Sequence, residues 1–156
     1  MVFFLYTDGA TSNNGYENSR GGWAAALYEG QSQEPLFSVS GPVPNSTNNI
    51  CEMKAIINGL AQIKTYFSLH FTAIPLIVVM TDSAYIYNCY AQQWYKKWQA
   101  NGWRNAKREP VANQELWEQL IPYFENPLYK FEKTKGHADD ARNNYVDKLA
   151  VAAKEM

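Results

Sequence analysis

Two stretches of the chain end in the same way: VFFLYTDGA at residues 2–10 and IVVMTDSA at residues 77–84. In each, an unbroken apolar run leads into Thr-Asp, and such a run is typical of a strand buried on both faces. We therefore expect strands over Val2–Thr7 and Ile74–Thr81. Because a helical segment separates them in the sequence, the two strands are expected to run parallel.

Asp8 and Asp82, which follow these strands, are the first candidate functional residues. If the strands are neighbours in register, both carboxylates lie at the carboxyl edge of the sheet, where open α/β sheets bind their ligands. Neighbouring strands are only about 4.8 Å apart, so the two carboxylates repel unless a proton or a cation intervenes. Hard oxygen ligands suit Mg²⁺ or Mn²⁺. Either aspartate alone could instead form a turn or cap the next helix, and that alternative stays open.

The remaining pattern predicts one domain over residues 1–156, an α/β protein with a mixed sheet and helical cover. Further strands are expected over Trp23–Tyr28, Leu36–Val39 and Leu128–Thr134, and helices over Thr47–Phe67, Ala84–Ala91, Asn113–Phe124 and Asp140–Lys154. The last helix is expected to turn inward Tyr145, Val146, Leu149 and Ala153. The glycine-rich stretch Ala10–Gly22 predicts a loop, and Gly41–Pro44 predicts a break in the pattern.

The composition indicates a folded, intracellular protein. Of the 156 residues, 46% are hydrophobic and 19% charged, which excludes a disordered or collagen-like chain. Fourteen Lys and Arg against fifteen Asp and Glu give a net charge of −1, so any nucleic-acid partner must be held by a local patch. Two cysteines make no disulfide framework. The apolar runs are far shorter than the roughly 20 residues of a membrane span, and no signal peptide is evident, so we expect a cytoplasmic protein without a membrane partner.

Two further acids and one histidine are candidates for the same site. Glu52 falls in the first turns of the long helix, beside its apolar stripe, although Asn49 and Glu52 also fit a capping box. Asp147 stands early in the last helix, where a polar residue is usually solvated. His137 precedes that helix in a flexible loop. Close to a metal cluster it could carry protons, and otherwise it is a surface residue.

These residues form an ordered set along the chain: Thr7-Asp8-Gly9, Thr47-Asn48-Asn49 with Glu52, Thr81-Asp82-Ser83, Gly136-His137-Ala138 and Asp147. The set resembles ribonuclease H of type 1, in its bacterial form with a basic protrusion, and the resemblance covers essentially the whole chain. It implies the ribonuclease H-like fold, a five-stranded mixed sheet whose first three strands are antiparallel, flanked by helices. It also implies the reaction, which is divalent-metal-dependent hydrolysis of the RNA strand of an RNA–DNA hybrid to 5′-phosphate and 3′-hydroxyl ends.

The same resemblance implies the catalytic roles. The family's four metal-binding carboxylates are matched by Asp8, Glu52, Asp82 and Asp147, which would hold Mg²⁺ or Mn²⁺, two ions per site with substrate bound. Asp8 would bridge the ions, and Asp147 would help to hold the ion that activates water. Glu52 and Asp82 would hold the ion beside the leaving oxygen. His137 matches the family's mobile histidine, assigned to proton transfer or product release.

Other positions match the family's substrate contacts. Asn14, Asn48 and Asn49 match residues that read 2′-hydroxyls in the minor groove, although asparagines also serve as loop and cap residues. Thr47 and Asn113 match part of a pocket that grips a DNA phosphate.

Two positions depart from the family's pattern. Asn45 stands where an arginine of the phosphate pocket is often found, and Ala84 stands where a glutamine is often found. Either departure is expected to reduce affinity or to alter duplex preference without touching the metal ligands.

The segment Trp94–Arg108 is the second substrate signal. It holds five of the fourteen basic residues, three of the five tryptophans and no acid. A solvated helix face explains the charges but not the tryptophans, and a core helix explains the tryptophans but not the charges. The segment resembles the family's basic protrusion, here about residues 94–110, which would contact the DNA strand through Lys96, Lys97, Trp98, Trp103, Arg104, Lys107 and Arg108. Binding through it would weaken steeply with salt.

Two rival interpretations stay open at this point. Another nuclease of the same fold would share the acidic cluster, but not the motif Thr47-Asn48-Asn49 together with the basic protrusion. A non-catalytic module that binds RNA–DNA hybrids is disfavoured by four intact carboxylates. We therefore expect an endoribonuclease that acts on RNA–DNA hybrids as a monomer.

Overall fold

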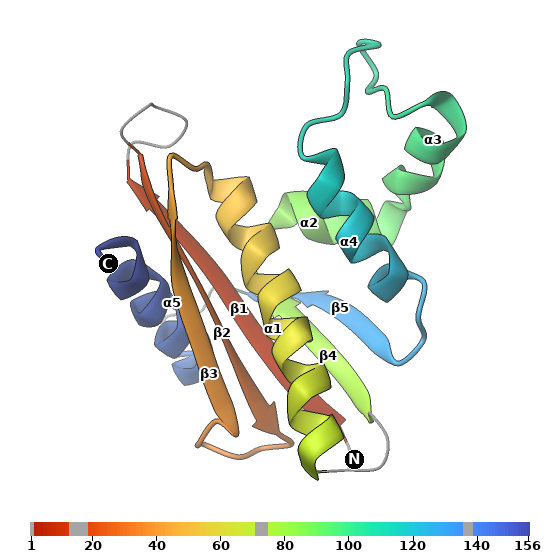
Figure 1. Ribbon diagram of the computed structural model, residues 1–156. Helices are drawn as coiled ribbons and strands as arrows, with labels where there is room; N and C mark the ends of the chain where they lie inside the picture. The colour runs from red at the N-terminus through yellow and green to blue at the C-terminus, as the bar shows by residue number, and fades with distance from the viewer. Residues whose placement is uncertain (1, 13–18, 71–74, 136–138) are drawn as a thin grey trace.

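A five-stranded sheet with the strand order β3-β2-β1-β4-β5 forms the centre of the fold (Figure 1). It is seen in a computed structural model that describes residues 2–12, 19–70, 75–135 and 139–156. The strands are β1 (Val2–Ser12), β2 (Arg20–Glu29), β3 (Phe37–Pro44), β4 (Leu76–Thr81) and β5 (Tyr129–Lys133). The first three strands pair antiparallel, whereas β4 runs parallel to β1 and β5 runs parallel to β4. The mixed sheet expected from the sequence is confirmed.

Helices cover both faces of this sheet. They are α1 (Asn48–His70), α2 (Ala84–Gln92), α3 (Trp94–Asn101), α4 (Gln114–Phe124) and α5 (Ala141–Lys154). The first long helix lies across β1 and β2 on one face, with α2 and α4 beside it, while α5 packs against β1, β2 and β3 on the other face (Figure 1). No helix in the described part of the chain is long and apolar enough to cross a membrane.

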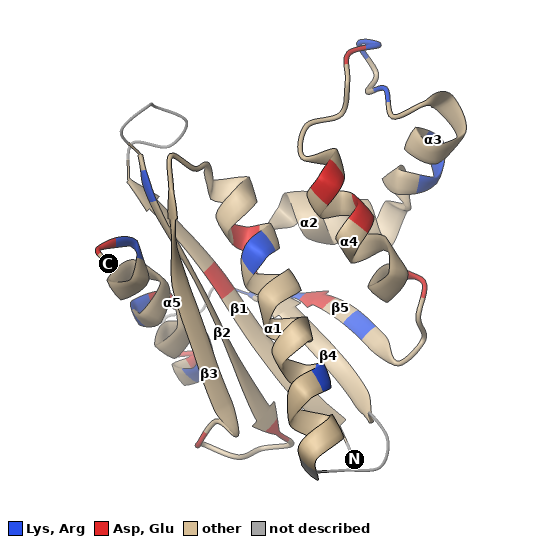
Figure 2. Cartoon of the chain, viewed as in Figure 1, with Lys and Arg blue, Asp and Glu red and all other residues tan. Residues whose placement is uncertain are grey.

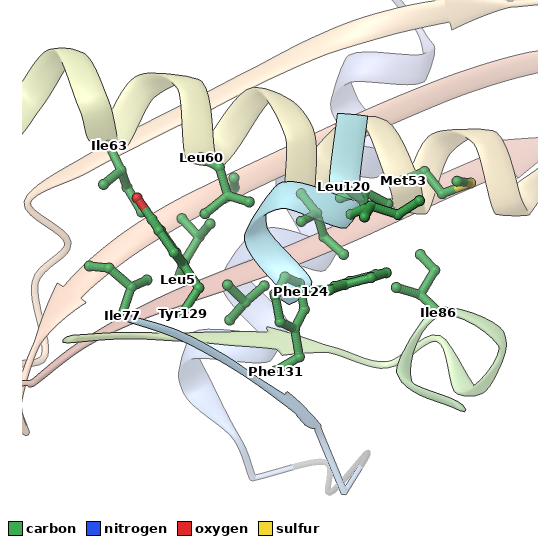
Figure 3. Close-up of a cluster of buried hydrophobic side chains, with 14 of the residues drawn as sticks. Leu5, Met53, Leu60, Ile63, Ile77, Ile86, Leu120, Phe124, Tyr129 and Phe131 are labelled. Atoms are coloured by element: carbon green, nitrogen blue, oxygen red, sulfur yellow. The ribbon is translucent and has the colours of Figure 1, made fainter. Parts of the chain in front are cut away.

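The main core lies between the sheet and the helices α1, α2 and α4. Figure 3 shows side chains from all these elements meeting there, among them Leu5, Met53, Leu60, Ile63, Ile77, Ile86, Leu120, Phe124, Tyr129 and Phe131. Buried residues on α1 recur every three or four positions, as the apolar stripe predicts. This packing holds α1 against β1, which fixes the start of the helix beside the carboxyl half of that strand.

The helix α5 is anchored to the turn between β2 and β3 by Arg142. Its Nη2 donates to the carbonyl oxygens of Gly30, at 2.8 Å, and Ser32, at 2.6 Å. The guanidinium also lies over the ring of Tyr28, 4.5 Å from its centroid. These contacts set the position of the helix that carries Asp147.

The predicted loop over Ala10–Gly22 is wrong at both ends. β1 continues to Ser12 and β2 begins at Arg20, so that Ala10 pairs with Gly22 and Ser12 with Arg20. The glycines suggested a loop, but they are needed for close packing. A Cβ on Gly21 would lie 2.5 Å from Sγ of Cys51, and one on Gly22 would collide with the backbone of α5.

The predicted break at Gly41–Pro44 is also wrong, because β3 continues through Pro44. β3 is an edge strand, where proline is tolerated since one row of N–H groups has no ladder partner. A Cβ on Gly41 would lie 2.9 Å from Nε1 of Trp23, so this glycine makes room for the indole.

One residue predicted to face inward from the last helix lies at the surface instead. Tyr145 is 37% exposed, and its hydroxyl donates to Oγ of Ser38 at 3.3 Å. The buried face of α5 is formed by Val146, Ala150 and Ala153.

Candidate active site

Asp8 and Asp82 lie on neighbouring parallel strands, as expected. Tyr6 in β1 is opposite Met80 in β4, and each aspartate follows two positions later in its own chain segment. The two carboxylates therefore reach the same edge of the sheet from adjacent strands.

Neither aspartate has the local role that the sequence left open. Asp8 is not at a turn, because β1 continues beyond it to Ser12. The cap of α2 is Ser83, whose Oγ accepts a hydrogen bond from the N–H of Ile86 at 3.2 Å. Asp82 is thus free of a capping role, and the local alternatives are wrong for both residues.

Glu52 is brought to the same place by the start of α1. The capping box with Asn49 is wrong, since Asn49 lies inside the helix and Thr47 caps it by accepting from the N–H of Ile50 at 3.2 Å. Instead, Oε1 of Glu52 accepts a hydrogen bond from the backbone N–H of Gly9 at 3.0 Å. That N–H also lies 3.0 Å from Oδ1 of Asp8, so a single donor orients two carboxylates.

Gly9 is a functional position that the sequence reasoning did not single out. A Cβ there would lie 2.6 Å from the backbone nitrogen of Glu52, so any side chain would push α1 away from β1. The available signal was the glycine placed directly after a strand aspartate, a sign of close backbone approach.

The three carboxylates form a cluster suited to a metal ion. One oxygen from each of Asp8, Glu52 and Asp82 lies within 4.8 Å of the others. Asp8 and Glu52 are buried, at 4% and 8% exposure, while Asp82 is open to solvent. Oε2 of Glu52 is buried and has no hydrogen-bond partner in the described residues. Clustered carboxylates with an unused buried oxygen fit a hard divalent cation.

Burial and mutual repulsion raise the pKa values of two of these carboxyl groups. Burial, and next the charge of Asp82, raise the pKa of Asp8 to about 7. Burial, followed by the charges of Asp82 and Asp8, raises the pKa of Glu52 well above its ordinary value. Asp147, which is exposed on α5, also contributes to the raised pKa of Asp8, but it is not one of the three carboxylates whose oxygens meet within 4.8 Å.

The predicted substrate residues on α1 flank this cluster. Asn48 and Asn49 lie in the exposed first turn of the helix, and Oδ1 of Asn48 accepts a hydrogen bond from the hydroxyl of Thr11. Asn14 and His137 lie outside the described residues.

A cavity of about 800 Å³ lies between the starts of α1 and α4. Its lining includes Asn45, which departs from the family's pattern for the phosphate pocket, and Asn113, which matches that pattern. Both have left-handed backbone, with φ of 52° and 61°, a conformation that asparagine adopts more readily than arginine does. Lys54 also lines the cavity and was missed, although it follows Thr47 by two helical turns. Ala84 is exposed in the first turn of α2.

The predicted basic protrusion has tryptophans that pack against the core and basic residues at its surface. Trp98 is half-buried, with its ring centroid 5.7 Å from that of Trp103 and 5.6 Å from that of Trp117 in the core. Figure 2 shows basic positions on α3 and along the loop that follows it. Exposed basic residues there are Lys96, Lys97, Arg104, Lys107 and Arg108. Within the described ranges, no carboxylate lies within 4.0 Å of any of these five side chains. The tryptophans therefore attach the protrusion to the core, while its basic side chains remain exposed.

The comparisons with known proteins agree with this geometry. A family model described as RNase H matches residues 2–155. The ribonuclease H of Caldicellulosiruptor saccharolyticus is 41% identical over 154 residues, which cover 97% of this chain and 96% of that protein. This chain belongs to the ribonuclease H family. Its activity is accordingly that of a ribonuclease H, an endonuclease that hydrolyses the RNA strand of an RNA–DNA hybrid.

Solved structures support the fold of this ribonuclease H. LC9-RNase H1, a type 1 enzyme with the type 2 active-site motif, superposes with a TM-score of 0.74 at 23% identity, covering 99% of this chain and 72% of that one. LC11-RNase H1 in complex with an RNA/DNA hybrid superposes with a TM-score of 0.68 at 20% identity, covering 98% and 96%. The family match and the acidic cluster leave the two rival interpretations, a different nuclease and a non-catalytic module, without support.

Proposed function

We propose that Asp8, Glu52, Asp82 and Asp147 form the catalytic centre of this ribonuclease H and hold Mg²⁺, with two ions per site when the hybrid is bound. The observation that carries this proposal is the convergence of Asp8, Glu52 and Asp82 from three separate elements to within 4.8 Å. When bound, divalent ions would supply a nucleophile at neutral pH and relieve negative charge on the phosphate and on the departing oxygen.

The protein's own groups prepare that chemistry. The N–H of Gly9 orients Asp8 and Glu52, and the packing of α1 against β1 keeps both carboxylates out of water. Asp82 and Asp147 complete the cluster from the open side, where a phosphodiester can approach. His137 would accept or release a proton beside this centre, in the role that the family resemblance implies.

The substrate would lie across the cluster and the protrusion. Asn48 and Asn49, next to the carboxylates in the exposed first turn of α1, would read the 2′-hydroxyls of the RNA strand, together with Asn14. The cavity lined by Asn45, Lys54 and Asn113 would receive a DNA phosphate, assisted by Thr47. The cations of the protrusion, which have no carboxylate within 4.0 Å among the described residues, would hold the DNA strand together with Trp98 and Trp103.

We further propose that the chain acts as one domain and as a monomer in the cytoplasm. The two cysteines, Cys51 and Cys89, are buried free thiols, which suits a reducing compartment. A monomer needs no partner side chain at the centre, since all four proposed ligands come from this chain.

One end-labelled RNA tests the function when it is offered single-stranded, paired with RNA and paired with DNA. Each form is incubated with Mg²⁺, with Mn²⁺ and with EDTA. The proposal predicts metal-dependent cleavage confined to the hybrid. Cleavage in EDTA would contradict the metal centre, and cleavage of double-stranded RNA would contradict the assigned reading of the duplex.

A further inference from the structure

A second cavity, separate from the carboxylate cluster, lies at the carboxyl ends of β4 and β5. It has a volume of about 330 Å³, and its lining residues are Met80, Glu132, Lys133, Thr134, Lys135 and Asp140. It adjoins the active site through the backbone, because the N–H of Thr134 donates to the carbonyl oxygen of Thr81 at 2.8 Å. Thr81 directly precedes Asp82. None of the lining residues has a role in the site described above.

Two acidic residues also line this cavity, and one of them has a local structural role. Oδ1 of Asp140 accepts a hydrogen bond from the N–H of Asn143 at 3.0 Å and so caps α5. Oε1 of Glu132 lies 4.0 Å from Nζ of Lys130, a residue of the same strand that does not line the cavity.

The two lysines and one threonine hydroxyl of this cavity are available to a ligand. In the ranges that the structure describes, neither Lys133 nor Lys135 has a carboxylate within 4.0 Å, and both are exposed. Thr134 is only 3% exposed, and its Oγ1 has no hydrogen-bond partner among the described residues. A buried hydroxyl without a partner costs free energy, which a ligand with acceptor oxygens would recover. Two ammonium groups beside an unused hydroxyl are the donors that a phosphate group needs.

We propose that this cavity, which we call the β5 subsite, binds a backbone phosphate of the RNA strand next to the scissile one. The inference rests on the proposed function, because it takes the scissile phosphate to lie at Asp82. Neighbouring strand ends lie about 4.8 Å apart, and successive phosphates of a strand advance by about 3.4 Å along the helix axis, so an RNA strand that runs from β4 towards β5 would bring an adjacent phosphate to this cavity. The basic protrusion, assigned to the DNA strand, extends from α3 and the following loop, away from the carboxyl ends of β4 and β5 (Figure 1). The β5 subsite would thus fix the register of the RNA over the carboxylates.

The test compares Lys133→Ala/Lys135→Ala with the wild type and with the control Lys64→Ala, which removes an exposed lysine of α1 outside the cavity. KM and kcat are measured on one hybrid between low and moderate salt. We expect the double variant to raise KM several-fold, to keep kcat, and to lower the slope of log KM against log salt by about 1, because the subsite neutralises one phosphate. Lys64→Ala is expected to behave as the wild type.

A second readout locates the phosphate. Neutral methylphosphonate linkages are placed one at a time on either side of the single cleavage site in the RNA strand. At one position the neutral linkage should raise KM for the wild type but not for the double variant, because the partner charge is already gone. Thr134→Val should raise KM without lowering Tm, since it removes a buried hydroxyl that has no partner.

Each contrary result has a distinct meaning. A double variant with the KM and salt slope of Lys64→Ala would overturn the β5 subsite while leaving the proposed function intact. The same conclusion follows if every neutral linkage affects the wild type and the double variant equally. Absence of hybrid cleavage by the wild type itself would overturn the proposed function, and the subsite with it.

Discussion

The backbone N–H of Gly9 donates to Oε1 of Glu52 at 3.0 Å, across 43 residues of sequence. This bond joins β1 to α1 at the point where the two carboxylates of Asp8 and Glu52 meet. It requires a close approach that only glycine permits, because a Cβ on residue 9 would lie 2.6 Å from the backbone of α1. The geometry of the cluster therefore depends on a residue without a side chain.

Gly9→Ala should lower both stability and activity. The added methyl group must displace the start of α1, at a cost of about 1–3 kcal/mol in the free energy of unfolding. The same displacement moves Glu52, so kcat should fall even at a temperature where the variant is fully folded. Thermal unfolding and steady-state kinetics on one preparation measure the two effects.

Gly30→Ala is the matched control for this substitution. Gly30 has a φ of 52° and open space around its Cβ position, so alanine there strains the backbone without a collision. The control should lose some stability and keep its kcat. Equal loss of kcat in both variants would show that instability alone, rather than the position of Glu52, explains the result for residue 9.

The metal-free enzyme should become less stable as the pH rises from about 4 to about 8. The pKa of Asp8 is raised to about 7 by burial first and by Asp82 second, whereas an unfolded aspartate titrates near 4. Between these values the folded state binds more protons than the unfolded state, so the free energy of unfolding falls with rising pH. The stabilisation is fully present below about pH 4 and is lost as the pH passes about 7.

Asp8→Asn should flatten this pH dependence and stabilise the metal-free protein at pH 8 by about 1–3 kcal/mol. Mg²⁺ should raise the Tm of the wild type at pH 8 and leave that of the variant nearly unchanged. Thermal denaturation in EDTA and in Mg²⁺ between pH 5 and 8 provides the measurement. A wild-type Tm that climbs with pH in EDTA would contradict the assignment of buried, mutually repelling carboxylates.

Lys107→Ala/Arg108→Ala should weaken substrate binding and spare the chemistry. Both side chains are exposed on the protrusion, well separated in sequence from every proposed metal ligand. KM should rise at moderate salt, the salt slope of log KM should fall by about 2, and kcat should stay nearly constant. A large fall in kcat with unchanged KM would contradict the prediction that the protrusion only holds the DNA strand.

The sequence predicted the catalytic side of the fold more accurately than its edges. Matching Thr-Asp endings predicted the parallel pair β1 and β4, because buried parallel strands are continuous apolar runs and their ends share one edge. Period and register are local properties, so they can be read from a single chain.

The wrong predictions concern glycines and prolines whose structural role depends on tertiary packing. Gly21 and Gly22 continue β2 because neighbouring elements leave no room for side chains. Pro42 and Pro44 continue β3 because it is an edge strand, and strand order was not evident from the pattern of Gly41–Pro44. The double hydrogen bond of the Gly9 N–H depends on the approach of α1 to β1, so its partner Glu52 could not be identified from the residues around Gly9.

The carboxylate centre is tested most sharply by the cleavage rate and hybrid affinity of Asp82→Asn, measured beside the wild type. Asp82 lies at the open side of the cluster, so asparagine should leave the fold and the hybrid-binding surface intact. Glu34→Gln, an equal change of charge on an exposed residue of the turn before β3, serves as the control. We expect Asp82→Asn to lose cleavage activity by about a thousandfold, equivalent to about 4 kcal/mol, with the Kd for the hybrid changed little. Cleavage by Asp82→Asn at the rate of the Glu34→Gln control would contradict the carboxylate centre.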